Sequence, residues 1–109
     1  SLPEWKEAVV DRARTNFECF KNHPSILFWS LGNESYAGDD IAAMQQFFKE
    51  KDDQRLVHYE GVFHNRAYED RISDVESRMY AYPQEIIDYL ENDPKKPYIC
   101  MIWAIPWAE

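Results

Sequence analysis

Short apolar-rich runs recur along this chain, and they leave it few ways to fold. Residues 26–31 are almost continuously apolar, which suits a strand covered on both faces, as in the parallel sheets of α/β folds. This run ends abruptly at Gly32. Further strands are expected at residues 56–61, 75–80 and 97–103.

Between these runs, apolar residues recur at three- and four-residue steps, which predicts amphipathic helices over residues 2–20, 41–48 and 83–90. Pro3 suits a first helical turn, and Asp39 and Asp40 can cap the second helix. Residues 62–74 are polar and predict a loop with at most a helical turn. The order helix, strand, helix, strand, strand, helix, strand is typical of a parallel α/β sheet with right-handed crossovers.

The charge balance excludes some classes of partner. The chain has 109 residues, of which 20 are acidic and 12 basic, so its formal net charge is −8. Nucleic acids and anionic membranes are bound through basic surfaces, so neither is an expected partner. No apolar run approaches the roughly 20 residues of a membrane helix, and no signal-peptide pattern is present at the N-terminus.

The two cysteines, Cys19 and Cys100, are far apart and belong to no metal-binding pattern. They predict reduced thiols in the core of a cytoplasmic protein rather than a disulfide or a zinc site. The histidines His23, His58 and His64 also lack zinc-ligand spacing. We expect His23 to fix its loop, His58 to lie on one face of a strand, and His64 to be solvated.

Polar residues at the carboxyl ends of the expected strands are the candidates for chemistry, because parallel α/β sheets bind ligands there. Asn33 and Glu34 follow the first strand, Glu60 the second and Tyr80 the third. Apolar surroundings would raise the pKa of Glu34 towards the range of a general acid, although a loop-closing carboxylate is the alternative. Tyr80 could likewise donate to a reacting carboxylate or be a half-buried core residue.

The segment 21–34 resembles the acid/base signature of family 2 glycoside hydrolases. It reads Lys-Asn-His-Pro-Ser-Ile-Leu-Phe-Trp-Ser-Leu-Gly-Asn-Glu. His-Tyr-Glu-Gly at 58–61, Ser-Arg-Met-Tyr at 77–80 and Lys-Pro-Tyr-Ile-Cys at 96–100 follow in the order and rough spacing of bacterial β-galactosidases. The resemblance covers residues 17–100. A β-glucuronidase-like hydrolase shares the Asn-Glu signature and remains an alternative.

The resemblance implies a partial (β/α)8 TIM barrel, with residues 1–109 supplying about four parallel strands, the fourth to the seventh, and their helices. Glu34 would be the general acid/base, Asn33 would bind a sugar hydroxyl, and Tyr80 would hydrogen-bond the nucleophile. The implied reaction is hydrolysis of terminal β-galactosides with retention, using two carboxyls about 5–5.5 Å apart. Glu34 would also border a magnesium site of the full-length enzyme, whereas this chain by itself is expected to hold no cofactor.

The tail, residues 101–109, departs from the family pattern. After Cys100 the family continues with Glu-Tyr, and that Glu is the nucleophile, whereas Met101 follows here. The chain by itself is therefore expected to be inactive, and a non-catalytic α/β binding or structural module is the alternative interpretation. Half a barrel leaves strand edges open, so we also expect self-association into a homo-oligomer.

Overall fold

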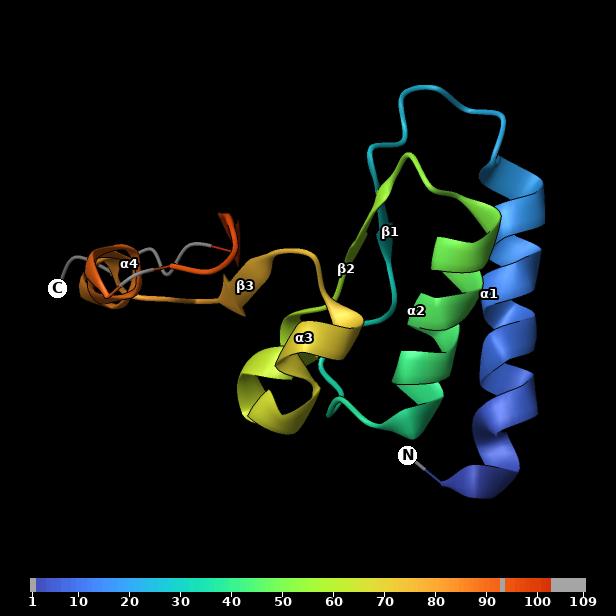
Figure 1. The fold of residues 1–109 in the computed structure, drawn as a ribbon, viewed down its shortest axis with the longest axis horizontal. Coiled ribbons are helices and arrows are strands. Elements are labelled where there is room, and N and C mark those ends of the chain that lie inside the picture. The colour runs from blue at the N-terminus through green and yellow to red at the C-terminus, as the bar shows by residue number, and fades with distance from the viewer. Residues whose placement is uncertain (1, 93, 103–109) are drawn as a thin grey trace, which may run out of the picture.

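A computed structural model describes residues 2–92 and 94–102, except the side chains of residues 69, 70 and 102. Much of the expected tail, residues 103–109, lies outside this range. In chain order the elements are η1 (Pro3–Trp5), α1 (Lys6–Phe20), β1 (Phe28–Ser30), α2 (Asp39–Lys51), β2 (Leu56–His58), η2 (Glu60–His64), η3 (Arg66–Tyr68), α3 (Glu69–Ile72), β3 (Glu76–Met79), α4 (Pro83–Glu91) and β4 (Tyr98–Ile102). Helices and short parallel strands alternate, as predicted (Figure 1).

The strands pair in parallel, but the described residues form two sheets of two strands rather than one continuous sheet. β1 pairs with β2, with Trp29 opposite Val57, and β3 pairs with β4. One backbone bond, from Asp74 N–H to the Val57 carbonyl (2.9 Å), joins β2 to the segment before β3, and side chains add two more. Val57 N–H donates to Oδ2 of Asp74 (2.7 Å), and Tyr59 N–H donates to Oγ of Ser73 (3.1 Å).

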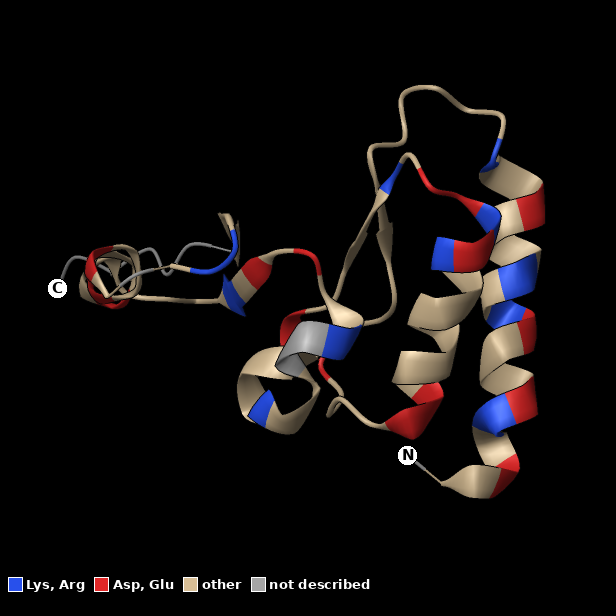
Figure 2. Cartoon of the chain, viewed as in Figure 1, with Lys and Arg blue, Asp and Glu red and all other residues tan. Residues whose placement is uncertain are grey.

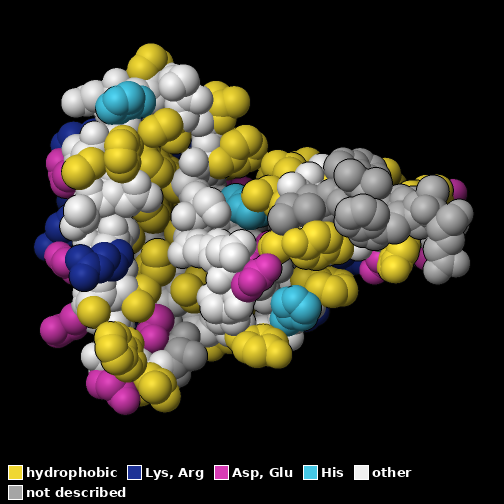
Figure 3. All heavy atoms as spheres, turned by 180° about the vertical axis from the view of Figure 1, so that it is seen from behind, with side chains coloured by type: hydrophobic (Ala, Val, Ile, Leu, Met, Phe, Trp, Pro, Cys, Tyr) yellow, Lys and Arg dark blue, Asp and Glu magenta, His cyan; other side chains and the backbone are white. Residues whose placement is uncertain are grey.

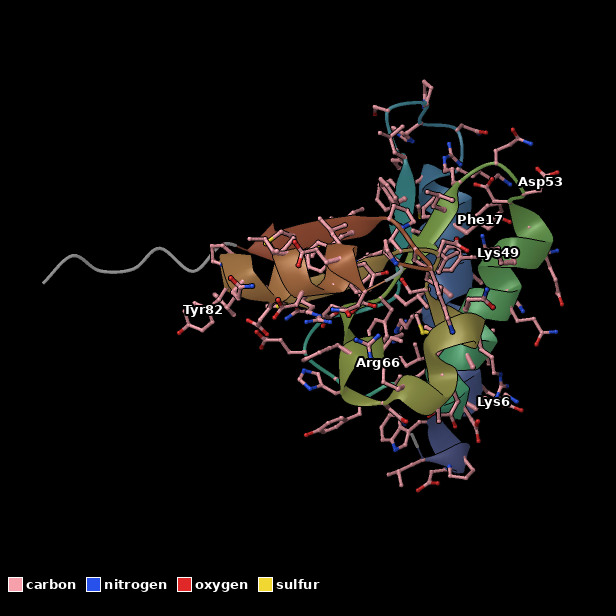
Figure 4. All side chains as sticks on the ribbon, turned by 60° about the vertical axis from the view of Figure 1, so that its left-hand side comes forward. Lys6, Phe17, Lys49, Asp53, Arg66 and Tyr82 are labelled. Atoms are coloured by element: carbon pink, nitrogen blue, oxygen red, sulfur yellow. The ribbon has the colours of Figure 1, made fainter. Side chains whose placement is uncertain are left out.

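The core lies between the helices α1 and α2 and the inner face of β1–β2 (Figure 1). Phe17 of α1 points from its helix towards the sheet (Figure 4) and lies 5.7 Å from the Trp29 ring. Phe48 of α2 stacks on the same Trp29 at 5.1 Å between ring centroids. Trp29 is 3% exposed, which confirms the prediction that this residue is core.

The helix ends differ in detail from the prediction. The N-cap of α2 is Gly38, which has no side chain to accept a capping hydrogen bond. Asp39 and Asp40, which are predicted as caps, lie inside the first turn. Their negative charges still interact favourably with the partial positive charge of the helix N-terminus. Lys49 and Lys51 in the last turn do the same at the negative C-terminus (Figure 2). The prediction of a loop with at most a helical turn over residues 62–74 is partly wrong, because this segment contains the end of η2, η3 and the short helix α3.

The cysteine prediction is partly wrong. Cys19 and Cys100 are not joined by a disulfide, but Cys19 is exposed on α1 and Cys100 is intermediate in exposure, so Cys19 is not a core residue. Among the described residues, no helix is both long and apolar enough to span a membrane.

Asp52 ties the end of α2 to β1 and β2. Its carboxylate accepts hydrogen bonds from Nε1 of Trp29 (2.9 Å) and Nη1 of Arg55 (2.8 Å), and its side chain is 8% exposed. Burial raises the pKa of Asp52, whereas hydrogen bonds from Trp29, Arg55 and Gln54 lower it. The balance brings the pKa from 3.8 to about 2. The charged carboxylate is therefore the form that the folded chain prefers.

We predict that the free energy of unfolding falls as the pH is lowered through the window set by Asp52. Because folding lowers the pKa of Asp52, its charged carboxylate stabilises the folded chain at pH values above 3.8, the ordinary pKa of the group. This contribution is lost as the pH falls towards 2. Asp52→Asn should flatten this part of the pH profile measured by urea unfolding. Asp53→Asn is the matched control, because Asp53 is exposed at the edge of the molecule (Figure 4). Equal pH profiles for Asp52→Asn and the unaltered chain would contradict the prediction.

Apolar side chains are also exposed on the strands. Phe28 and Leu56 are register partners in the β1–β2 sheet and are 38% and 41% exposed, and the neighbouring Leu27 is 68% exposed. Seen from behind, hydrophobic side chains gather on the surface of the molecule (Figure 3). This surface is the physical basis for the expected self-association.

We predict that the chain self-associates in a concentration-dependent way. Phe28→Ser should weaken association, because it removes an aromatic ring from the exposed face of β1. Sedimentation velocity over a concentration series measures this, with Ser30→Ala on the same strand as the control. A monomer at every concentration would show the expectation to be wrong.

Candidate functional site

One cavity of about 400 Å³ lies where the segments after β1 and β2 meet the end of β3. Glu34 comes from the loop after β1, Glu60 from the start of η2, and Tyr80 from the residue after β3. The structure therefore brings together three of the residues predicted at strand ends. The other lining residues are Ser35, Tyr36, Phe63, His64, Arg78 and Met79.

Glu34 is held on a strained backbone. Its φ is 51°, in the left-handed region, and its side chain is exposed. Its backbone N–H donates to Oε1 of Glu60 over 2.6 Å. The carboxylate acceptor makes this a charge-assisted hydrogen bond, so it is stronger than a bond to a neutral acceptor.

Tyr80 has the same unusual backbone, with φ of 56°, and is 55% exposed. Over the described residues, Glu34 and Tyr80 are the two non-glycine residues with positive φ. Such a conformation costs about 1–3 kcal/mol per residue and clusters at active sites and ligand clamps. Tyr80 is thus not a half-buried core residue, and both strained residues line the same cavity.

An ion cluster centred on the buried Glu76 supports the β3 side of the cavity. Both guanidinium NH₂ groups of Arg66 donate to Glu76 at 2.8 Å, and Nε of Arg78 donates to Glu76 at 3.1 Å (Arg66 is labelled in Figure 4). Burial raises the pKa of Glu76, but the hydrogen bonds and charges of the two arginines lower it overall. The Arg78 guanidinium also lies 4.4 Å from the centre of the Phe63 ring. Arg78 is therefore fixed in orientation at the cavity wall.

Asn33 is exposed and adjacent to Glu34 in the chain, but it is not among the described residues that line the cavity. Phe63, His64 and Arg78 do line it, and the sequence reasoning did not assign them to a site. The signal for Arg78 was its place in the Ser-Arg-Met-Tyr block. Phe63 and His64 lie in the short helix η2, and five residues are too few to show a helical repeat in the sequence that would have marked them.

The histidines behave largely as predicted. His23 closes its loop, since its backbone N–H donates to the carbonyl of Phe20 (3.0 Å), and His64 is exposed. His58 is buried, with Nε2 2.8 Å from Oγ of Ser77. Burial lowers the pKa of His58, although the charge of Glu60 opposes this. A neutral His58 thus links β2 to β3.

The donor set in the described part of the chain does not make a complete metal site. No group of three or more His, Cys, Asp or Glu side chains that could hold a metal ion is found there. Glu34 and Glu60 share the cavity, but one Glu60 oxygen is already used by the Glu34 N–H. Magnesium takes near-octahedral oxygen coordination, so these two carboxylates could supply only part of it.

The chain is similar to known enzymes over nearly its whole length. Residues 1–105 match the family described as "Glycosyl hydrolases family 2, TIM barrel domain". A β-galactosidase large subunit of Leuconostoc lactis is 70% identical over 97 residues, and that of Lactobacillus helveticus is 66% identical over 99. These alignments cover 89% and 91% of this chain and 16% of each relative. A β-galactosidase of Halalkalibacterium halodurans is 66% identical over 96 residues, 88% of this chain and 9% of the relative.

Proposed function

The chain belongs to glycosyl hydrolase family 2, and we propose that it carries the acid/base half of a retaining β-galactosidase active site. One observation carries the proposal. Glu34 and Tyr80, both on strained backbones, line one cavity at the carboxyl ends of parallel strands. Because the chain spans 16% or less of the three relatives described above, the activity itself is proposed for a protein that contains this segment together with the rest of the barrel.

The proposed mechanism assigns each step to a named group. The Glu34 carboxyl donates a proton to the glycosidic oxygen as the bond to the leaving group breaks, and its carboxylate then removes a proton from the attacking water. The Tyr80 hydroxyl donates a hydrogen bond to the nucleophilic carboxylate. Asn33 would bind a hydroxyl of the sugar. In this chain Met101 stands where the family has its nucleophile, so the covalent intermediate needs a carboxylate from elsewhere.

Three further properties are proposed on the same basis. Glu34 would supply one oxygen ligand of a magnesium ion, the others coming from residues outside the described part of the chain. No step of the mechanism above depends on the metal. Two of the relatives described above are named large subunits, and we propose that this segment also works within a multi-subunit enzyme. We also propose a cytoplasmic location, which is supported by the absence of a disulfide between the two described cysteines.

A segment exchange tests the function. Residues 1–98 of this chain replace the matching segment of the Leuconostoc lactis large subunit, which keeps that enzyme's own nucleophile. We expect the chimera to hydrolyse a nitrophenyl β-galactoside with kcat within about tenfold of its parent, because 70% of the aligned residues are identical. Folded chimera without activity would contradict the proposal. A preference for β-glucuronides would favour the β-glucuronidase-like alternative.

We predict no β-galactosidase activity from the 109-residue chain by itself. The position after Cys100 is Met101, whose side chain cannot form the glycosyl ester. The measurement is turnover of the same nitrophenyl substrate, with Glu34→Gln as the background control. Turnover above that control would overturn both this prediction and the assigned mechanism.

A further inference from the structure

We propose that the segment Tyr59–Glu60–Gly61, called here the clamp, positions Glu34 for proton transfer, with Glu60 as the principal positioning residue. The proposal rests on the proposed function of Glu34 but assigns a task to residues outside that mechanism. Three contacts carry it, one from each residue of the clamp, and two of them meet at the Ser35 carbonyl oxygen.

The first contact is the hydrogen bond from Glu34 N–H to Oε1 of Glu60. Glu60 is 7% exposed, so the bond forms away from most of the competing water. The left-handed φ of Glu34 costs free energy and persists only when neighbouring groups hold it. A charge-assisted bond to the strained residue's own amide is such a restraint.

The second contact comes from Tyr59, whose ring is 1% exposed. Its hydroxyl donates to the carbonyl oxygen of Ser35 over 2.5 Å and also contacts the Ser35 hydroxyl. Ser35 directly follows Glu34. The backbone is thus held at the Glu34 amide and again at the next carbonyl, which restricts the direction in which the Glu34 side chain leaves the chain.

The third contact is the close approach of the loop to Gly61. A Cβ built on Gly61 would lie 2.2 Å from the Ser35 carbonyl oxygen, well inside van der Waals contact. The Glu34–Ser35 loop therefore rests directly on the backbone of the clamp. This fit requires glycine for the space it leaves, since Gly61 does not have positive φ.

The clamp acts on catalysis through the proton. A general acid must lie within hydrogen-bond reach of the leaving-group oxygen, and small misplacements reduce the rate strongly. An activated leaving group, such as dinitrophenolate, departs with little help from an acid, whereas a sugar needs the proton. A positioning role therefore predicts a loss that depends on the leaving group, and a merely structural role predicts an equal loss for all substrates.

The contact itself is tested by NMR on the full 109-residue chain. In Glu60→Leu we expect the Glu34 amide proton to move upfield and to exchange faster with solvent, because its carboxylate acceptor is gone. Glu60→Gln keeps an acceptor oxygen, so the Glu34 amide proton should show an intermediate shift. This variant also tests the contact if Glu60→Leu does not fold. Glu7→Gln, on the exposed face of α1, is the control. An unchanged Glu34 amide in both Glu60 variants would overturn the proposal.

The consequence for the reaction is tested in the chimera with its own nucleophile. Glu60→Leu should lower kcat/KM for lactose by about 100-fold and for a dinitrophenyl β-galactoside by less than about threefold. Glu60→Gln should recover much of the lactose loss. Equal losses on both substrates, or no loss on lactose, would overturn the positioning role. An inactive chimera before any Glu60 change would count against the proposed function, while the NMR result would still decide whether the clamp holds Glu34.

Discussion

Glu34→Gln in the chimera is expected to lower kcat for lactose by about 10²–10⁴-fold, the usual contribution of a general acid or base. Gln has nearly the shape of Glu and can keep the backbone N–H bond to Glu60, so the cavity should stay intact. What it lacks is the proton to give to the leaving group and the base to activate water. The loss therefore reports the chemistry of one carboxyl group.

The leaving group and an added nucleophile separate this explanation from misfolding. With a dinitrophenyl β-galactoside, the first step of Glu34→Gln should be nearly normal, so the galactosyl-enzyme should accumulate. Azide needs no base to attack, and we expect it to restore part of the turnover and to yield β-galactosyl azide. Glu7→Gln is the matched carboxylate control. A Glu34→Gln chimera with the kcat of its parent would remove Glu34 from the mechanism.

The strand and helix positions could be predicted because each rests on a local pattern. The run 26–31 contains β1, and the three- and four-residue spacing up to Phe20 matches α1. The parallel direction of the strands was predicted, but their division into two separate sheets could not be predicted in this way. The side chains of Ser73 and Asp74 occupy backbone donors of β2 and its following residue, and no local pattern distinguishes such residues from an ordinary polar loop.

The candidate site shows the same division. Glu34, Glu60 and Tyr80 could be predicted as a group because each lies at the carboxyl end of an expected strand, and the cavity brings all three together. The positive φ of Glu34 and of Tyr80 could not be predicted from the sequence, because Glu and Tyr have no preference for that conformation. At Glu34 it accompanies a backbone hydrogen bond to Glu60, a residue 26 positions away in the sequence. The strain and the clamp are thus properties of the folded chain rather than of the motif.

Gly61→Ala is expected to destabilise this chain far more than the same change at Gly32. The added Cβ would lie 2.2 Å from the Ser35 carbonyl oxygen and 2.5 Å from the Tyr59 ring. The first of these atoms belongs to the backbone, so relief requires the Glu34–Ser35 loop to move. Overpacking of this kind lowers the free energy of unfolding by about 1–3 kcal/mol, occasionally more.

Gly32→Ala is the matched control, because it adds the same methyl group to the same loop system. Its Cβ would lie 3.5 Å from Cε2 of Tyr59, an ordinary contact, and neither glycine has positive φ. Urea unfolding of the chain should therefore show a lower midpoint for Gly61→Ala than for Gly32→Ala at equal slope. In the chimera, Gly61→Ala should also lose lactose activity in greater proportion than dinitrophenyl activity, since it displaces Glu34. Equal midpoints for the two alanine variants would mean that the loop has room to yield at Gly61, and the clamp could then not fix the direction of the acid.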